Sequence, residues 1–323
     1  MLEIRDLHVQ FHGSDHEAVR GIDLTVGDGE IVGLVGESGS GKTVTAMMIS
    51  GLLRPEQASF RGQILLDGRD LLTSSGDTLR SIQGRDICVV FQEPMSAMDP
   101  TMRIGPQVEE CLRVHTDLPP KRRRELALQA LRDVDLPDAE EVYRKYPHEL
   151  SGGMLQRVMI AAAILPQPRL LLADEPTTAL DVTIQAQILD LLRNLKDKIN
   201  SSIMLITHDL GVIAEMADYV VVMYAGRVVE KGTAQEIFAN PAHPYTIGLM
   251  ASKPMVGKKV DKLYSIPGKV PNPINMPNYC YFKDRCEMCV DGCQGEYPHM
   301  IQLSPTHMVS CYRYYGKEDA QNG

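Results

Sequence analysis

The stretch GLVGESGSGKT runs from Gly33 to Thr43 and decides the fold class. From Gly36 onward it has the pattern G-x-x-x-x-G-K-[ST], between an apolar segment and a helical pattern that extends to about Leu52. The glycines let the backbone curl so that successive N–H groups face a phosphate, and the N-terminus of the following helix adds a positive potential. Lys42 is expected to contact the phosphates, and the Thr43 hydroxyl to bind Mg²⁺. The predicted phosphate-binding residues are Gly36, Ser38, Gly39, Ser40, Gly41, Lys42 and Thr43.

A second motif, LLLADE, runs from Leu170 to Glu175. Its apolar residues predict a buried strand that carries two acids to the carboxyl edge of a sheet, where ligands bind in folds of this kind. We expect Asp174 to hold Mg²⁺ through water and Glu175 to polarise the attacking water. Phosphoryl transfer depends mainly on positioning and charge neutralisation, so a lysine, a metal ion, an acid and a water-orienting group suffice.

The remaining patterns predict an α/β domain in which strands alternate with helices, and hence a largely parallel sheet covered on both faces. Strands are expected at 2–11, 18–26, 30–36, 61–68, 86–92, 168–176, 201–209 and 218–232, and an amphipathic helix at 181–199. A helical pattern at about 94–163 predicts an inserted subdomain. After about residue 240, proline is frequent and periodicity is lost, which predicts a loop-rich tail too poor in apolar residues to build its own core. The expected domains are therefore 1–240 and 241–323.

Composition narrows the functional classes. The net charge of −9 over 323 residues argues against nucleic acid as a partner, because phosphate contacts need clustered Lys and Arg. The start of the chain, MLEIRDLHVQF, lacks a signal-peptide pattern, and the longest apolar runs fall short of the ~20 residues that cross a bilayer. Work at a membrane would therefore need partners that span it. Seven cysteines without a secretion signal favour reduced thiols or metal ligation.

Further motifs surround these two in a specific order. Gln92 lies in VVFQEP, and LSGGM, from Leu150 to Met154, lies upstream of LLLADEP. TALD then ends at Asp181, and His208 lies in ITHDL. Together they resemble the ABC-type ATPases over about residues 1–240. The resemblance implies a P-loop nucleotide-binding domain with a mixed sheet core, an antiparallel edge sheet and an inserted helical subdomain.

The same resemblance implies roles for individual residues. Catalysis is expected from Lys42, Gln92, Glu175 and His208, with Gln92 joining Thr43 and Asp174 around Mg²⁺. Adenine is expected to stack on Phe11. A helix that begins with Ser151, Gly152 and Gly153 would face the γ-phosphate of ATP held by a second subunit, with Asp181 nearby. Serine is also a good N-cap residue on physical grounds. Met154 and Leu155 depart from the commoner residues of the family, but neither removes a phosphate ligand.

Longer segments narrow the resemblance. Three segments resemble ATP-binding subunits of oligopeptide and dipeptide importers, a group that includes nickel importers. They are FQEPMSAMDPTMRIGPQVEE, which contains Gln92, NPAHPYTIGLM, and the proline- and cysteine-rich tail. This implies a peripheral subunit at the cytoplasmic face of the membrane. Its implied partners are a similar second ATPase rather than a copy of itself, two membrane subunits and an extracytoplasmic binding protein. The alternatives are nickel or another small solute as cargo, or a non-transport ABC ATPase with a metal cluster. The last is disfavoured by the single phosphate loop, the lack of long heptads and the negative charge.

The tail carries CYFKDRCEMCVDGC, from Cys280 to Cys293, followed by Cys311. From the residues alone, four thiolates could hold zinc or an iron–sulfur cluster, or the thiols could remain unligated. The spacing C-x5-C-x6-C with a distant fourth cysteine resembles the peptide-importer tail, which the family associates with a [4Fe–4S] cluster. The implied ligands are Cys280, Cys286, Cys293 and Cys311. Cys289 is then spare, or it replaces Cys286 or Cys293.

Overall fold

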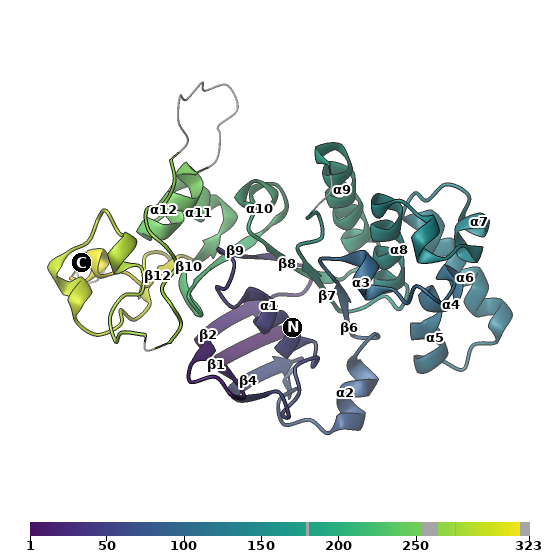
Figure 1. The fold of residues 1–323 in the computed structure, drawn as a ribbon, viewed down its shortest axis with the longest axis horizontal. Helices are drawn as coiled ribbons and strands as arrows, with labels where there is room; N and C mark the ends of the chain where they lie inside the picture. Colours follow the sequence, from purple (N-terminus) through teal and green to yellow (C-terminus); the bar gives the residue numbers. More distant parts are fainter. Residues whose placement is uncertain (179–180, 253–263, 275, 317–323) are drawn as a thin grey trace.

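Two sheets organise the protein in the computed structural model, which describes residues 1–178, 181–252, 264–274 and 276–316 (Figure 1). In the described residues, the smaller sheet is antiparallel with the order β2-β1-β4-β5. Its strands are β1 Leu2–Phe11, β2 Glu17–Val26, β4 Ala58–Leu66 and β5 Arg69–Asp70. The larger sheet has the order β11-β12-β10-β9-β3-β8-β7-β6. Its strands are β3 Ile31–Val35, β6 Ile87–Val90, β7 Leu170–Asp174, β8 Ser202–Thr207, β9 Tyr219–Tyr224, β10 Arg227–Thr233, β11 Ile301–Gln302 and β12 Met308–Val309.

The centre of the larger sheet is parallel, from β9 through β3, β8 and β7 to β6. Its strands are buried at nearly every position and consist mostly of apolar residues, because both faces of the sheet are covered. In β3, Val32 and Leu34 pack into the core shared with the antiparallel sheet, whereas Ile31 and Val35 pack into the core on the opposite face. The predicted alternation of strands and helices is confirmed, and β10, β12 and β11 make the sheet mixed by adding antiparallel strands at one edge.

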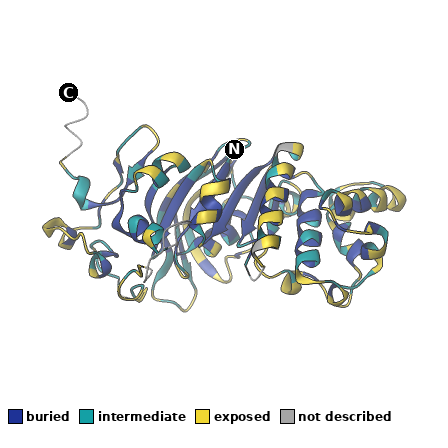
Figure 2. Ribbon diagram, turned by 90° about the horizontal axis from the view of Figure 1, so that it is seen from above, coloured by how far each residue is buried: buried dark blue, intermediate teal, exposed yellow. Residues whose placement is uncertain are grey.

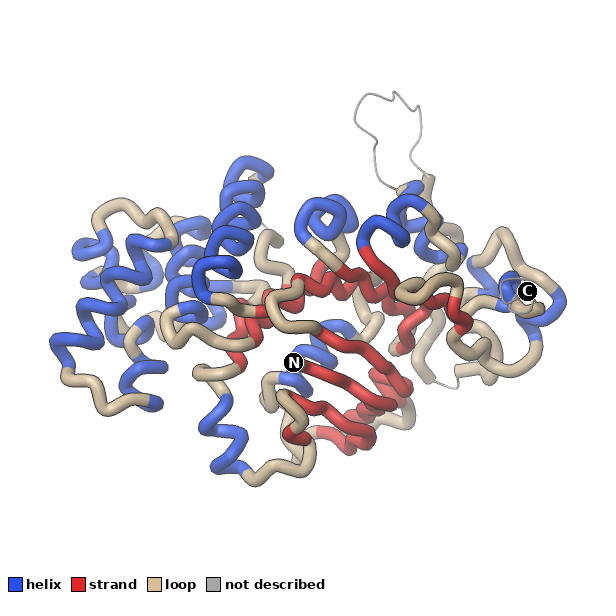
Figure 3. The backbone as a smooth tube through the Cα atoms, turned by 180° about the vertical axis from the view of Figure 1, so that it is seen from behind, coloured by secondary structure: helices blue, strands red, loops and turns tan. Residues whose placement is uncertain are grey.

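Helices cover the larger sheet from both sides (Figures 1 and 3). The first, α1 Lys42–Ile49, contributes Ala46, Met48 and Ile49 to the core between the two sheets. The opposite face is covered by α8 Gly152–Ile164, α9 Val182–Ile199, α10 Leu210–Met216 and α11 Ala234–Ala239. In the described chain, none of the helices is long and apolar enough to cross a membrane.

The inserted helical region lies at one end of the molecule, beyond β6 (Figure 1). It consists of α3 Pro94–Ala97, α4 Ile104–Val108, α5 Glu110–His115, α6 Pro120–Asp133 and α7 Ala139–Arg144, followed by a 3₁₀ turn at Pro147–Glu149. Its apolar positions pack on α8, so the predicted subdomain shares one core with the sheet. A short helix, α2 Gly76–Ile82, precedes it and was not predicted from the sequence.

The C-terminal extension lies at the other end of the molecule and is rich in loops, as predicted, with a few short regular elements (Figures 1 and 2). It forms α12 Pro244–Ala251, β11 and β12, and 3₁₀ turns at Lys283–Arg285, Asp291–Gln294 and Tyr312–Tyr314. Strand β12 pairs with β10, and Tyr281 and Phe282 are buried in the main core. The extension needs few apolar residues of its own because it packs on the core of the larger sheet.

Candidate functional site

The phosphate loop connects β3 to α1 in a conformation that only glycine tolerates well. Gly36 has φ +156°, and a Cβ there would lie 2.2 Å from the carbonyl oxygen of Met223. Gly41 is the N-cap of α1 with φ +99°. The Lys42 ammonium folds into the loop and donates to the carbonyl oxygens of Gly36, at 2.7 Å, and Glu37, at 3.0 Å. Burial lowers the pKa of Lys42, while the nearby carboxylates act in the opposite direction.

Asp174 ends β7 beside the start of α1. Its side chain is buried, burial raises its pKa, and a hydrogen bond from Thr43 acts in the opposite direction. The Oδ1 atom of Asp174 has no hydrogen-bond partner among the described residues. A buried carboxylate oxygen without a donor is costly, and an oxygen-binding cation would remove that cost. Asp174 and Thr43 therefore fit a Mg²⁺ site, and the assignment stays a prediction.

Glu175 lies at the centre of the candidate catalytic group. Its backbone has φ +47°, a left-handed conformation that is uncommon for residues other than glycine and often marks functional sites. Its carboxylate accepts hydrogen bonds from Gln92 Nε2 at 3.2 Å and Thr178 Oγ1 at 2.7 Å, and it contacts His208 Nδ1 at 3.1 Å. Burial raises the pKa of Glu175, but the hydrogen bonds from Thr178 and His208 outweigh it and the net shift is downward. The carboxylate is thus kept ionised, as a group that orients water must be.

These contacts bring Gln92, Glu175 and His208 together, although they come from separate segments at the carboxyl ends of β6, β7 and β8. Thr178 was not predicted from the sequence as a catalytic residue. It belongs to the TALD segment, and the short spacing from Glu175 was the signal that could have suggested it. Residues 179 and 180 of that segment lie outside the described part of the chain.

The remaining predicted residues lie apart from this group. Ser151 is the N-cap of α8, where its Oγ accepts from the N–H of Met154 at 3.4 Å; Gly152 and Gly153 form the first turn. Asp181 caps α9 in the same way through the N–H of Ile184, at 3.0 Å. Phe11 is half-buried at the end of β1. Within the described residues, Ser151, Asp181 and Phe11 make no hydrogen bond or ion pair with the phosphate loop. The helix that Ser151 caps presents an exposed N-terminus.

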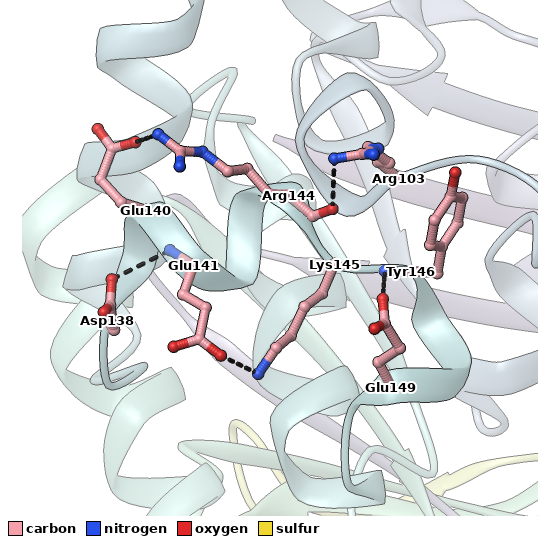
Figure 4. A pocket seen from close by; sticks show the side chains of 8 residues that line it. All are labelled: Arg103, Asp138, Glu140, Glu141, Arg144, Lys145, Tyr146 and Glu149. Carbon is pink, nitrogen blue, oxygen red and sulfur yellow. Dashed lines mark hydrogen bonds and ion pairs between the residues drawn. The ribbon is translucent and has the colours of Figure 1, made fainter.

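A groove and a polar pocket flank the helical region. The groove has apolar walls that include Leu52, Phe91, Met98 and Val114, with Leu52, Phe91 and Val114 among the exposed apolar side chains. The polar pocket is shown in Figure 4, and many of its polar groups interact within it. Lys145 forms an ion pair with Glu141, and the Glu149 carboxylate accepts a hydrogen bond from the N–H of Tyr146. Only the groove has the character of a docking surface for an apolar partner.

All seven cysteines carry free thiols. Cys280, Cys286, Cys293 and Cys311 lie near one another in the extension, since Cys293 contributes to raising the pKa of the other three after the main effect of burial. Cys289 is exposed, its thiol donates to the carbonyl oxygen of Val290 at 3.7 Å, and the nearby Cys293 thiol helps to raise its pKa after the main effect of burial. The donor chemistry therefore suits an iron–sulfur cluster or zinc. Yet across the described residues, no three or more His, Cys, Asp or Glu side chains are arranged as a metal-binding set. The predicted ligation stays a prediction.

Fold and site together define an ABC-type ATPase, and comparison with known proteins agrees. A family model described as "ABC transporter" matches residues 19–178, and one described as "Oligopeptide/dipeptide transporter, C-terminal region" matches residues 229–293. The chain is 44% identical to the oligopeptide transport ATP-binding protein AppD of Bacillus subtilis, over 97% of both chains. It is 45% identical to the dipeptide transport ATP-binding protein DppD of Lactococcus lactis, over 97% of this chain and 90% of that protein.

Solved structures give the same class. The dimeric structure of MJ0796, a bacterial ABC transporter cassette, is similar with a TM-score of 0.65 and 27% identity, over 72% of this chain and 99% of that one. A post-hydrolysis dimer of the same cassette bound to ADP and Pi is equally similar. This chain therefore belongs to the ATP-binding proteins of the oligopeptide and dipeptide ABC transporter family.

Proposed function

We propose that this chain hydrolyses ATP to power the uptake of di- or oligopeptides through partner membrane subunits, at the cytoplasmic face of the membrane. The observation that carries the proposal is the contact of Gln92, Thr178 and His208 with Glu175, next to a formed phosphate loop. The names of the peptide-transport relatives and the family match over residues 229–293 support the cargo class.

We propose the following residue roles, which the observed contacts and the family membership support. Lys42 and the N–H groups of the loop bind the β- and γ-phosphates of ATP. Asp174, Thr43 and Gln92 hold Mg²⁺, which when bound neutralises phosphate charge. Glu175 accepts a hydrogen bond from the attacking water and orients it, while His208 holds the carboxylate of Glu175. Phe11 stacks on the adenine. These groups supply the positioning and the charge that phosphoryl transfer requires.

One chain supplies only part of the complete site. The exposed N-terminus of α8, with Ser151, Gly152 and Gly153, is suited to the γ-phosphate of ATP bound to a second ATPase subunit, with Asp181 beside it. The dimeric structures of the similar cassette support this arrangement. We propose a related subunit as the partner rather than a second copy. ATP buried between the two subunits then closes the dimer, and hydrolysis opens it.

The groove beside Phe91 and Met98 is the proposed contact for the membrane subunits. It opens next to Gln92, so a helix seated there would move with the catalytic group. Closure of the dimer would thereby switch the membrane subunits between inward and outward states. An extracytoplasmic binding protein would deliver the cargo to them.

We also propose that Cys280, Cys286, Cys293 and Cys311 bind a [4Fe–4S] cluster, with zinc as the alternative. Their proximity and their donor type support this assignment. The role would be to stabilise residues 241–323, the proposed extension, against the 1–240 domain. No step of hydrolysis needs electrons.

Reconstitution tests the transport function. The chain, its partner ATPase, the membrane subunits and the binding protein are placed in proteoliposomes with ATP inside, and uptake of labelled di- and oligopeptides and of Ni²⁺ is measured. We expect peptide uptake that requires ATP and is lost with the Glu175→Gln variant. Nickel uptake without peptide uptake would support the alternative cargo. Nucleic-acid-stimulated ATPase activity without any uptake would contradict transport altogether.

A separate measurement tests the cluster. Protein purified without oxygen is assayed for iron, sulfide, zinc and visible absorption. Matching iron and sulfide with visible colour support [4Fe–4S], whereas stoichiometric zinc without colour supports the alternative. A Cys293→Ser variant should lose the metal, with Cys289→Ser as the control that keeps it. Retention of metal by both variants would mean that Cys289 replaces Cys293.

A further inference from the structure

Glu37, the residue after Gly36 in the phosphate loop, forms hydrogen bonds through its N–H, its carbonyl oxygen and its carboxylate. Its N–H donates to the hydroxyl of Tyr245 in α12, with the two atoms 2.8 Å apart. Its carbonyl oxygen accepts from Lys42 at 3.0 Å. Its carboxylate accepts two hydrogen bonds from the guanidinium of Arg285, at 2.6 and 3.1 Å. Two of these three partners belong to the C-terminal extension.

Arg285 follows Glu37 by 248 residues and lies in the 3₁₀ turn between Cys280 and Cys286. Only 6% of its side chain is exposed, against 30% for Glu37. The guanidinium also donates to the carbonyl oxygen of Pro267 at 2.9 Å and to the Tyr224 hydroxyl at 3.3 Å. A bidentate pair with a fixed guanidinium constrains the carboxylate far more than a mobile surface ion pair does.

The surrounding aromatic rings leave Arg285 little freedom to move. The guanidinium carbon lies 5.8 Å from the ring centres of Tyr224 and Phe282. Tyr245 packs against both of these rings, at 4.7 and 5.5 Å between ring centres, and is fully buried. The end of β9, helix α12 and the cysteine-bearing segment thus form one packed unit around the first turn of the phosphate loop.

This arrangement matters because Glu37 places a negative charge in a loop that must bind a polyanion. The carboxylate is close enough to Lys42 to help raise the pKa of that ammonium. While Arg285 is paired with it, that charge is compensated. Without Arg285, an unpaired and half-buried carboxylate would compete with phosphate for Lys42 and would release the N-terminal end of the loop.

We propose that Arg285 and Tyr245 are positioning residues of the ATPase site: they fix Glu37 and thereby make the phosphate-binding shape of the loop depend on the folded extension. The proposal rests on the role of the loop and Lys42 in binding ATP given above. It explains why a cysteine-bearing segment at the far end of the chain is packed against the nucleotide site.

The test compares single variants of the full chain, assembled with its partner subunits. Arg285→Gln is expected to raise the Kd for a fluorescent ATP analogue and the KM for ATP by about tenfold or more, because charge-assisted hydrogen bonds are lost. The kcat should change by less than about threefold. Tyr245→Phe removes only a hydroxyl and should raise both by about threefold to tenfold. Lys283→Gln is the matched control, because it removes the same charge in the same turn, where the ammonium lies over Tyr279. It should stay within about twofold of wild type.

A double variant separates positioning from simple support of the fold. In Glu37→Gln/Arg285→Gln no unpaired carboxylate remains, so the KM should return to within about threefold of wild type. The proposal would be overturned if the KM of the double variant rose by the product of the two single effects. It would also be overturned if Arg285→Gln folded with an unchanged KM, or if Lys283→Gln raised the KM as much as Arg285→Gln does. If Arg285→Gln fails to fold, the double variant and Tyr245→Phe decide. A wild-type complex without ATPase activity would instead refute the proposed function.

Discussion

The catalytic edge and the C-terminal extension are built in different ways. At the edge, Lys42, Asp174, Glu175 and His208 each follow directly on a strand or begin a helix, so the local backbone places them. In the extension, Arg285 and His307 pair with residues far away in the sequence, and these buried polar contacts add to the packing of its aromatic side chains on the main core. A change at the edge should therefore alter chemistry and spare the fold. A change in the extension should alter the stability of the fold. It should affect the catalytic site only where the extension contacts that site.

The sharpest test of this contrast is Glu175→Gln. It removes the charge that we propose orients the attacking water, and it should slow phosphate release by about 10³-fold, within the range for loss of a general base. ATP-bound dimers should accumulate, which size-exclusion chromatography with ATP detects, and thermal stability should be unchanged. Glu215→Gln, on the exposed surface of α10, serves as the control. Normal turnover by the Glu175 variant would remove that residue from the mechanism.

Glu230→Gln should show the opposite pattern. The Glu230 carboxylate is fully buried and accepts from the N–H groups of Ala242 and His243, at 2.7 and 2.9 Å, and contacts His307 Nε2 at 2.8 Å. Breaking a buried pair of this kind should lower the free energy of unfolding by about 3 kcal/mol. Denaturant unfolding measures it, with kcat per folded molecule expected to be unchanged. An unaltered unfolding curve would mean that the extension is held mainly by its aromatic contacts.

Thr178→Val probes the catalytic edge with a smaller change. It removes one of the hydrogen bonds that keep the pKa of Glu175 lowered, so that pKa should rise. Since the proposed role of Glu175 requires its ionised form, the acidic limb of the pH dependence of kcat should move to higher pH. At neutral pH the rate should fall by about tenfold, the effect of one hydrogen bond to a charged group. A reduced rate with an unmoved acidic limb would show that Thr178 only supports the loop.

The smallest effect is expected from Glu236→Gln, at the contact between α11 and the extension. Hydrogen bonds, chiefly from Ser304 and also from Thr233 and Thr306, lower the pKa of Glu236 from 4.5 to about 2. A lowered carboxylate pKa stabilises the fold fully above pH 4.5, and this contribution is lost as the pH falls toward 2. The variant should therefore lose stability at neutral pH and show a flatter decline of Tm with acid. Parallel curves for the variant and wild type would contradict the role of Glu236.

Much of the molecule followed from the sequence alone. The strands at the centre of the larger sheet, the phosphate loop, and the acids at the end of β7, Asp174 and Glu175, were predicted at or near their observed positions. They depend on short-range rules: continuous apolar runs make strands buried on both faces, and glycines allow one particular loop. The resemblance to ABC-type ATPases supplied Gln92 and His208, which no local pattern assigns.

Only the tertiary structure shows which distant segments of the chain contact one another. No periodicity or spacing connects Glu37 with Arg285, or Glu230 with His307, which are 248 and 77 residues apart. The pairing of β12 with β10 and the burial of Tyr281 and Phe282 in the main core were likewise invisible, because each short segment lacks a signal until its partner is in place. Buried polar contacts between distant segments are set by packing, and packing is a property of the whole chain.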